Sequence, residues 1–360
     1  EPTLIEAQTF LVLVSACVPQ AAAAPTQAAA AGITVTDSLG RQVALPKPPS
    51  RIVITGRALF MVIDAIYMFP NVSERIAAMG DAGQGTGNFI AMVDPNYKAK
   101  MTLQQDASAE QIAAVQPDLV ILKSYLAETV GKPLEVLKIP VVYVDFETPE
   151  QYQRDIAILG KVLQNEARAK QLAAYYESKV AEIQAAVKGA SSKPRVLMLY
   201  YSDKDGAVAF NVPPMSWIQT RMVELAGGEP AWSSANPGSG WTKVSLEQIA
   251  AWDADRIFII TYNKNPSGVT AELKANPQWQ ALKAVKAGHL YAFAGDVFSW
   301  DQADTRWILG LAWLATRLHP ELAAKLDITQ QAKQFYETVY GLDGAFFEQN
   351  IRPTFRGDLP

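Results

Sequence analysis

The chain contains little cysteine and little histidine, and both shortages limit the kinds of site that it can build. Its single cysteine, Cys17, forbids an internal disulfide and any thiolate-rich zinc or iron–sulfur site. The two histidines, His289 and His319, are too few for a metal site made of several imidazoles. Basic residues do not outnumber acidic ones, with 32 Lys and Arg against 36 Asp and Glu. The net charge of −4 excludes a general nucleic-acid-binding protein, which needs a basic surface to replace phosphate counterions.

The N-terminal segment also lacks an apolar run long enough to span a membrane. Residues 10–16 form a short apolar stretch, far below the roughly 20 residues that a bilayer requires. The sequence Val14-Ser15-Ala16-Cys17 resembles a bacterial lipobox, so we expect a truncated signal peptide and acylation of Cys17. Residues 18–31 are mostly Ala with Pro and Gln, a composition typical of a tether. We therefore expect an exported lipoprotein held to the membrane by its lipid alone; a lone buried Cys in a frayed terminus is the alternative.

The rest of the chain has the composition of a globular protein and the pattern of an α/β fold. Hydrophobic residues make up 49% and charged residues 19%, and the length suits about two domains. From Ile33 onward short apolar runs alternate with helical stretches, and the pattern restarts after Pro194. Such alternation predicts βαβ units around largely parallel sheets. The predicted strands are residues 51–55, 119–122 and 141–144, and then residues 196–199, 257–260 and 290–293.

An internal repeat indicates that the two domains are similar lobes. Residues 108–114 (SAEQIAA) recur as residues 245–251 (SLEQIAA), and an apolar strand follows each copy. Ser followed three residues later by Gln predicts a capping box, in which the two side chains satisfy free backbone N–H groups at a helix start. Glu110 and Glu247 then fall in the first helical turn, where the helix dipole favours a negative charge. Taken alone, this pattern is that of a solvated helix start.

Two helices are predicted between the lobes. Thr148 can cap a helix with Pro149 at its first position, and Asn165 can cap a second helix that runs to about Lys188. The second helix would be roughly 35 Å long, enough to lie across both lobes as a rigid strut. The predicted organisation is a leader and tether at 1–32, an N-terminal lobe at 33–148, linking helices at 149–189, a C-terminal lobe at 190–330, and a C-terminal helix and tail at 331–360.

Catalytic motifs are missing from the sequence. Residues 238–240 lack the spacing of a nucleophile elbow, and no Walker A sequence occurs. A glycine-rich turn at residues 83–88 is typical of an anion cradle built from backbone N–H groups, or simply of a plain turn. We therefore expect no enzyme. A secreted two-lobed α/β enzyme is the competing class, and it would need a nucleophile with a partner or a perturbed acid or base in a cleft.

Aromatic and cationic residues are concentrated where the predicted strands end. In open parallel sheets, ligands bind beyond the carboxyl ends of the strands. All eight Trp lie between Trp217 and Trp313, so the second half is the more aromatic one. We assign Trp307 and Trp313 to packing because they lie on an apolar predicted helix. The residues expected to line a ligand cleft are Arg57, Lys123, Tyr125, Tyr201, Lys204, Trp217, Trp241, Tyr262 and Trp300.

These features together resemble the class III substrate-binding proteins of ABC importers, which capture iron–siderophore, haem and cobalamin complexes. The resemblance covers about residues 33–320. It rests on the order and spacing of short matches at residues 37–41, 46–54, 110–112, 116–121, 225–228, 299–301 and 306–310. It implies two Rossmann-like lobes with central parallel sheets, joined by a single long rigid helix, with the ligand held between them.

The resemblance also implies roles for particular residues. One Glu on each lobe of the family docks onto Arg residues of the permease dimer, and those positions correspond to Glu110 and Glu247. Trp241 corresponds to a ligand-stacking Trp of the vitamin B12-binding member. Two further aromatic contacts of that member fall on Gln104 and near Lys123, and these departures argue against cobalamin.

The resemblance leaves the ligand open. Members that bind bare zinc or manganese use several His, whereas an aromatic wall with Arg57, Lys123 and Lys204 suits an anionic metal chelate. We therefore expect a monomeric protein with no intrinsic cofactor that binds a chelated metal, such as an iron complex. Some members take molybdate or tungstate, which the glycine-rich turn would suit, so an oxyanion is the alternative ligand. A sensory protein that docks onto a receptor is a further alternative.

Overall fold

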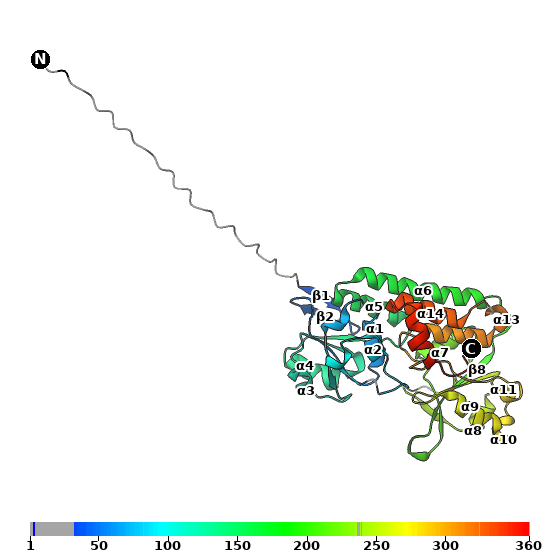
Figure 1. Cartoon of the computed structure of the whole chain (residues 1–360). Coiled ribbons are helices and arrows are strands. Elements are labelled where there is room, and N and C mark those ends of the chain that lie inside the picture. Colours follow the sequence, from blue (N-terminus) through cyan, green and yellow to red (C-terminus); the bar gives the residue numbers. More distant parts are fainter. Residues whose placement is uncertain are drawn as a thin grey trace. The chain divides into compact units, whose positions relative to one another are not determined.

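The computed structural model describes residue 3 and residues 32–81, 83–235, 238, 240–323 and 325–359. The chain divides into two units, Glu1–Ala31 and Gly32–Pro360. Cys17, with almost all of the predicted leader and tether, lies outside the described residues. The second unit is an α/β structure with two large β-sheets flanked by helices, as the sequence predicts (Figure 1).

The first lobe is built on a five-stranded sheet in which all neighbouring strands are parallel. The strand order is β5-β4-β3-β6-β7. Its central strands β3 and β6 are buried along their whole length, which explains why they form unbroken apolar runs in the sequence. The strands are β3 (Ile52–Ile54), β4 (Ile76–Gly80), β5 (Met101–Leu103), β6 (Leu119–Lys123) and β7 (Val141–Val144), and a hairpin of β1 (Ile33–Thr36) and β2 (Gln42–Leu45) precedes them. The helices are α1 (Phe60–Ile66), α2 (Phe89–Val93), α3 (Ala109–Ala114) and α4 (Lys132–Val136).

The second lobe repeats this scheme with one change. Its sheet has the order β11-β9-β8-β12-β13, and β10 also pairs with β8. Strands β8, β12 and β13 are parallel, but β9 runs antiparallel to β8 and forms with it a hairpin that the sequence pattern did not predict. The strands are β8 (Arg195–Ser202), β9 (Ala209–Val212), β10 (Glu229–Pro230), β11 (Thr242–Val244), β12 (Arg256–Ile260) and β13 (Leu290–Ala292). The helices are α7 (Ile218–Leu225), α8 (Leu246–Ala251), α9 (Pro266–Ala275), α10 (Pro277–Gln280), α11 (Lys283–Lys286), α12 (Trp307–Leu318) and α13 (Pro320–Ala323).

Both predicted linking helices are present between the sheets. Helix α5 (Pro149–Leu163) begins at Thr148, whose side chain accepts a hydrogen bond from the amide of Gln151. Helix α6 (Glu166–Val187) begins at Asn165, whose side chain accepts from the amide of Arg168. Helix α6 packs against α5 at one end and against α7, α12 and α13 of the second lobe, so it spans both lobes (Figure 1).

The repeated segment folds as two matching helix starts. Ser108 begins α3 and Ser245 begins α8, and each forms a complete capping box with the Gln three residues later. The carboxylates of Glu110 and Glu247 are both exposed. Each has a pKa below its usual range: the largest cause is the hydrogen bond from Ser108 for Glu110 and the hydrogen bond from its own backbone amide for Glu247. The predicted capping boxes and the positions of both Glu residues in the first helical turn are therefore confirmed.

The C-terminal segment packs back onto both lobes. Helix α14 (Ile328–Tyr340) buries Phe335, Tyr336 and Val339, and α15 (Gly344–Phe346) follows it. Near the end of the chain, Arg356 and Gly295 exchange two backbone hydrogen bonds of 2.9 and 3.1 Å. The buried side chains of α14 therefore belong to the core of this unit.

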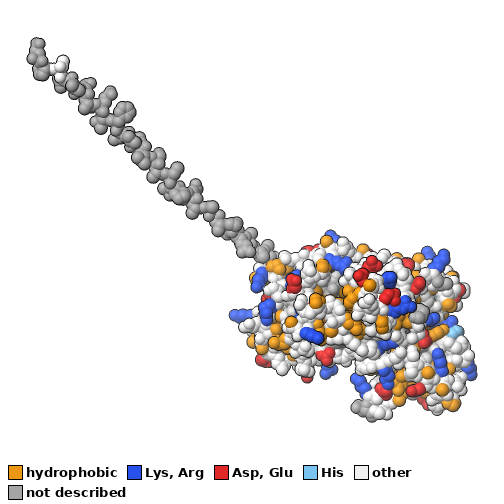
Figure 2. Space-filling view, viewed as in Figure 1, with side chains coloured by type: hydrophobic (Ala, Val, Ile, Leu, Met, Phe, Trp, Pro, Cys, Tyr) orange, Lys and Arg blue, Asp and Glu red, His pale blue; other side chains and the backbone are white. Residues whose placement is uncertain are grey.

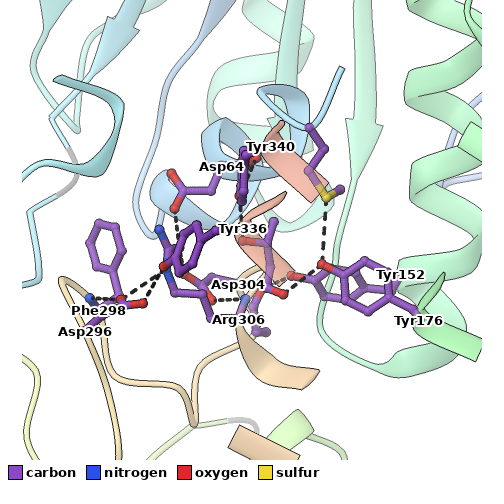
Figure 3. A network of polar contacts seen from close by, with 12 residues as sticks. Asp64, Tyr152, Tyr176, Asp296, Phe298, Asp304, Arg306, Tyr336 and Tyr340 are labelled. Carbon is purple, nitrogen blue, oxygen red and sulfur yellow. Dashed lines mark hydrogen bonds and ion pairs between the residues drawn. The ribbon is translucent and has the colours of Figure 1, made fainter. Parts of the chain in front are cut away.

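A buried polar network lies where the lobes meet (Figure 3). Its centre is Arg306, which is fully buried just before α12 and contacts the carboxylates of Asp64, Asp296 and Asp304 at 2.6, 3.1 and 2.7 Å. Asp64 belongs to α1 of the first lobe, whereas the other three belong to the second. The hydroxyl of Tyr336, on α14, accepts from Nε of Arg306 and donates to Asp296. Three parts of the chain are thus held together around one guanidinium.

Tyrosines extend this network toward the linking helices. The hydroxyl of Tyr152, on α5, donates to the carbonyl of Ala303 (2.9 Å), and that of Tyr176, on α6, donates to the carbonyl of Thr305 (2.7 Å). The segment that leads into α12 therefore hydrogen-bonds to both linking helices. Burial raises the pKa of Asp64 and of Asp304, while the charge of Arg306 opposes that rise. Pulling the lobes apart would expose or unpair these charged groups, so the network holds them in one arrangement.

The surface has no dominant charge on the face drawn in Figure 2, where basic and acidic side chains are interspersed. Among the described residues, no helix combines the length and the apolar character that a membrane crossing requires.

Candidate functional site

A cavity of about 490 Å³ lies between the lobes at the carboxyl ends of the strands. The first lobe contributes residues that follow β3, β4, β6 and β7, and the second lobe contributes residues that follow β9 and β12 or precede β11 and α12. This is the position where open α/β sheets bind ligands. The lining residues are Ala58, Met61, Gln84, Lys123, Ser124, Tyr125, Asp145, Glu147, Trp217, Gln219, Trp241, Tyr262, Gln302 and Ala303.

An aromatic wall forms the second-lobe side of the cavity. Trp217 and Trp241 meet edge to face with ring centroids 5.7 Å apart, and Trp241 lies 6.3 Å from Tyr262. Behind them Tyr200 stacks on Tyr262 at 4.7 Å and contacts Trp241 at 5.1 Å. These contacts hold the rings in place, so the wall is ready to pack against a flat or apolar ligand face.

The first-lobe side carries Lys123 and Tyr125 at the end of β6. The ammonium group of Lys123 is buried and forms an ion pair with Glu147, and it lies 3.3 Å from Sδ of Met61. The hydroxyl of Tyr125 donates to the backbone carbonyl of Arg57 at 3.0 Å, although the side chain is largely exposed. Lys123, Tyr125, Trp217, Trp241 and Tyr262 therefore lie around one cavity, as predicted; that they contact a ligand stays a prediction.

Polar residues that the sequence did not single out complete the cavity. Gln219 and Gln302 line it although their side chains are almost fully buried. Asp301 lies beneath them, where its Oδ2 accepts from Nε2 of Gln219 and from the hydroxyl of Tyr262, both at 3.2 Å. Burial raises the pKa of Asp301 to about 6, against the opposing effect of these hydrogen bonds. Asp301 was visible only as part of the match at residues 299–301, and single glutamines carry no sequence signal.

Trp300 does not line the cavity, so its predicted role in the cleft is wrong. Its side chain is fully buried and packs edge to face on Phe355, with ring centroids 5.6 Å apart. Its backbone also lies so close to α12 that a Cβ on Gly310 would come within 2.1 Å of the Trp300 carbonyl oxygen. The ring fills the core beside the C-terminal segment, which the sequence pattern did not place there.

Three other predicted residues lie off the cavity lining. Tyr201 and Lys204 belong to the hairpin of β8 and β9, where Lys204 is exposed. The ammonium of Lys264 lies over the Tyr201 ring, 5.1 Å from its centroid. Arg57 is exposed beside Tyr125 and does not line the cavity. The long β8 strand explains the first two positions, because it carries its end residues away from the sheet edge into the unpredicted hairpin.

The glycine-rich turn bridges the lobes and is not a free anion cradle. The amide of Gly85 donates to the carbonyl of Tyr262 at 3.2 Å, and the amide of Thr86 donates to the carbonyl of Val297 at 2.9 Å. Gly85 has a φ of +95°, and a Cβ there would lie 2.7 Å from the ring of Phe298. The turn needs glycine for this close approach, and the anion-cradle interpretation is wrong for these two amides.

Within the described part of the chain, no group of three or more His, Cys, Asp and Glu side chains is arranged to hold a metal ion.

Comparisons with known proteins agree with this geometry. Residues 69–296 match the family described as periplasmic binding protein. The chain is 24% identical over 257 residues to the achromobactin-binding periplasmic protein of Dickeya dadantii. The alignment covers 68% of this chain and 82% of that protein. It is 20% identical over 331 residues to the molybdate-binding protein MolA of Haemophilus influenzae. That alignment covers 85% of this chain and 90% of MolA. Its fold matches a periplasmic solute binding protein from Veillonella parvula with a TM-score of 0.70 at 24% identity, over 89% of this chain and 99% of the other.

Proposed function

Because the chain belongs to the periplasmic binding protein family, we propose that it binds a chelated metal ion in the cavity between its lobes and delivers it to the permease of an ABC importer. The observation that carries this proposal is the cavity itself, which is lined by both lobes and has one rigid aromatic side. Its volume of about 490 Å³ suits a small-molecule ligand. The achromobactin-binding relative supports a metal chelate as the ligand class.

Delivery to a permease is supported by the two matching helix starts. Glu110 and Glu247 are exposed, ionised and positioned by identical capping boxes on the two lobes. A pair of carboxylates in equivalent positions suits a partner that presents a cation to each lobe, as a permease dimer would. We further propose that the protein acts outside the cytoplasm as a monomer, anchored through a lipid on Cys17, and that it is a binding protein rather than an enzyme.

An oxyanion is the second candidate ligand, because the similarity to the molybdate-binding protein MolA covers most of both chains. Two observations weigh against it. The amides of Gly85 and Thr86 already donate to carbonyl groups, and the only Lys or Arg among the described lining residues, Lys123, is paired with Glu147. A small tetrahedral anion would find few free donors in this cavity.

Native mass spectrometry with metal analysis tests the proposal on protein taken from its source. We expect a bound mass that contains iron or another chelated metal together with its organic ligand. Molybdenum or tungsten without an organic ligand would favour the oxyanion. A bound organic molecule without any metal would overturn the metal-chelate proposal.

A further inference from the structure

The charged groups that line the cavity neutralise one another. Lys123 forms its ion pair with Glu147 inside the lining. Asp145 receives a hydrogen bond from the Ser124 hydroxyl and pairs with Arg154 at 2.6 Å. The lining residues themselves carry one Lys and two carboxylates, so no cationic side chain of the described lining is left without a carboxylate partner.

The other charged residues near the cavity, Arg57, Lys204, Asp301 and the buried Arg356, are not among its described lining residues. Asp301 adds a carboxyl group beneath the cavity; burial raises its pKa to about 6, and the buried Arg356 guanidinium offsets its charge. Arg57, next to the lining residue Ala58, is exposed to water, which screens its charge. Lys204 lies on the β8–β9 hairpin. A multiply charged anion would therefore lose its hydration inside the cavity without meeting an opposite charge to replace it.

Buried amide groups on the lining lack hydrogen-bond partners. Oε1 of Gln219, Oε1 of Gln84 and Nε2 of Gln302 have no partner, and the side chains of Gln219 and Gln302 are only 4% and 2% exposed. The orientation of Gln219 is set by Asp301, because an ionised carboxylate only accepts and must face the amide nitrogen. Oε1 of Gln219 then has no hydrogen-bond donor. A buried polar atom without a partner is costly, so a ligand group that reaches one of these three amide atoms from the cavity would recover a lost hydrogen bond.

We infer that the ligand is a metal chelate that is uncharged or singly positive overall and that carries hydrogen-bond donors such as hydroxyl, amide or ammonium groups. This inference rests on the proposed function and names its ligand class. The donors meet Oε1 of Gln219 and Gln84, an acceptor meets Nε2 of Gln302, and an apolar face packs on Trp217, Trp241 and Tyr262. The sequence-based expectation of an anionic chelate assumed that Lys123 and Lys204 are free cations in the cleft, and neither is.

The affinities of ferric complexes of different charge test the inference. The probes are a neutral tris-hydroxamate, a tris-hydroxamate with one free ammonium group, ferric citrate and a trianionic tris-catecholate, each titrated into the protein by calorimetry at two salt concentrations. We expect the neutral and the monocationic complexes to bind at least about 10-fold more tightly than either anion, with little dependence on salt. Tighter binding of an anion that weakens steeply with salt would overturn the inference and leave the proposed function standing.

The native mass spectrum decides the case in which none of the four complexes binds. A recovered metal complex with no net negative charge supports the inference, and a recovered anionic complex overturns it. Protein from its source that carries no metal complex overturns the proposed function and the inference with it.

Substitution of the glutamines separates this polar site from general packing. We expect Gln219→Leu and Gln302→Leu each to weaken the preferred complex about 10-fold, whereas Gln280→Leu, at an exposed position, leaves it unchanged. Gln219→Glu should shift the preference further toward the monocationic complex. Thermal unfolding of each variant identifies loss of fold, and unchanged affinity in both folded Leu variants would contradict the polar site.

Discussion

Nη1 of Arg306 lies 2.6 Å from Oδ2 of Asp64, and this buried ion pair joins the second lobe to helix α1 of the first. Neither side chain is more than 1% exposed. Two hydroxyls, those of Tyr152 and Tyr176, fix the backbone just before Arg306 from the linking helices. The cavity residues Gln302 and Ala303 belong to the same short segment, so the network that joins the lobes also positions one side of the ligand site.

Removal of the central guanidinium should destabilise the whole unit. Arg306→Met leaves three buried carboxylates without their counter-charge, and breaking a buried pair on one side costs about 3–5 kcal/mol. Arg352→Met removes an exposed pair with Glu348 and should change stability by less than about 1 kcal/mol. Urea unfolding measures both variants, and equal losses would contradict the central role of Arg306.

The pH dependence of stability reports on the same carboxylates. Burial raises the pKa of Asp64 above the value of about 3.9 that it has in an unfolded chain. The folded state therefore holds the proton more tightly, and this contribution to stability is full below about pH 4 and is lost as the pH rises through the raised pKa. Asp64→Asn removes the contribution, so we expect the slope of unfolding free energy against pH to become more positive, by at most about 1.4 kcal/mol per pH unit.

Unfolding of the two proteins across about pH 5 to about pH 8 measures that slope. Asp253→Asn, at an exposed position, serves as the control and should leave the slope almost unchanged. Identical slopes in Asp64→Asn and in the parent protein would show that Asp64 is ionised in both states.

The aromatic wall should contribute directly to ligand affinity. Trp241→Ala removes a ring that lies on the cavity and contacts Trp217 and Tyr200, so we expect the affinity for the bound chelate to fall about 10-fold or more. Tyr201→Ala, on the β8–β9 hairpin, should leave the affinity unchanged because Tyr201 does not line the cavity. Quenching of tryptophan fluorescence or calorimetry measures both. A larger loss for Tyr201→Ala would place the ligand elsewhere.

Charge reversal at the repeated helix starts should separate binding from delivery. We expect Glu110→Arg and Glu247→Arg to bind the ligand normally, because both side chains are exposed on helices away from the cavity lining, but to stop uptake by cells. Glu166→Arg offers a matched control, since Glu166 is also exposed in the first turn of a helix. Normal uptake by both docking variants would favour a solvated helix start without a partner.

The glycine-rich turn should tolerate a side chain at one glycine and not at the other. Gly85→Ala places a Cβ 2.7 Å from Phe298 at a φ of +95°, so we expect a loss of about 2 kcal/mol in the free energy of unfolding. Gly87→Ala meets nothing closer than 3.6 Å and should cost much less. Similar stabilities for the two variants would contradict the close contact between this turn and the second lobe.

Local physical signals account for what could be predicted from the chain. Unbroken apolar runs identified the buried central strands, because a strand buried on both faces needs apolar residues at successive positions. The Ser and Gln of the repeat identified both capping boxes, because hydrogen bonding at a helix start depends on residues close in sequence. Thr148 and Asn165 located the linking helices for the same reason. Residues at strand ends, such as Lys123 and Tyr262, were predicted to share a cleft because the carboxyl ends of parallel strands meet at one edge.

Pairings between distant residues could not be predicted in this way. The sequence alone determined an α/β chain with two similar lobes, its linking helices and five residues that meet at one cavity. Only the tertiary structure decided that Trp300 fills the core, that the glycine-rich turn donates its amides across the lobes, and that Lys123 is neutralised by Glu147. The physical reason is that a side chain's charge and exposure depend on partners brought beside it by the fold, and these partners stand far away in the sequence or carry no pattern of their own.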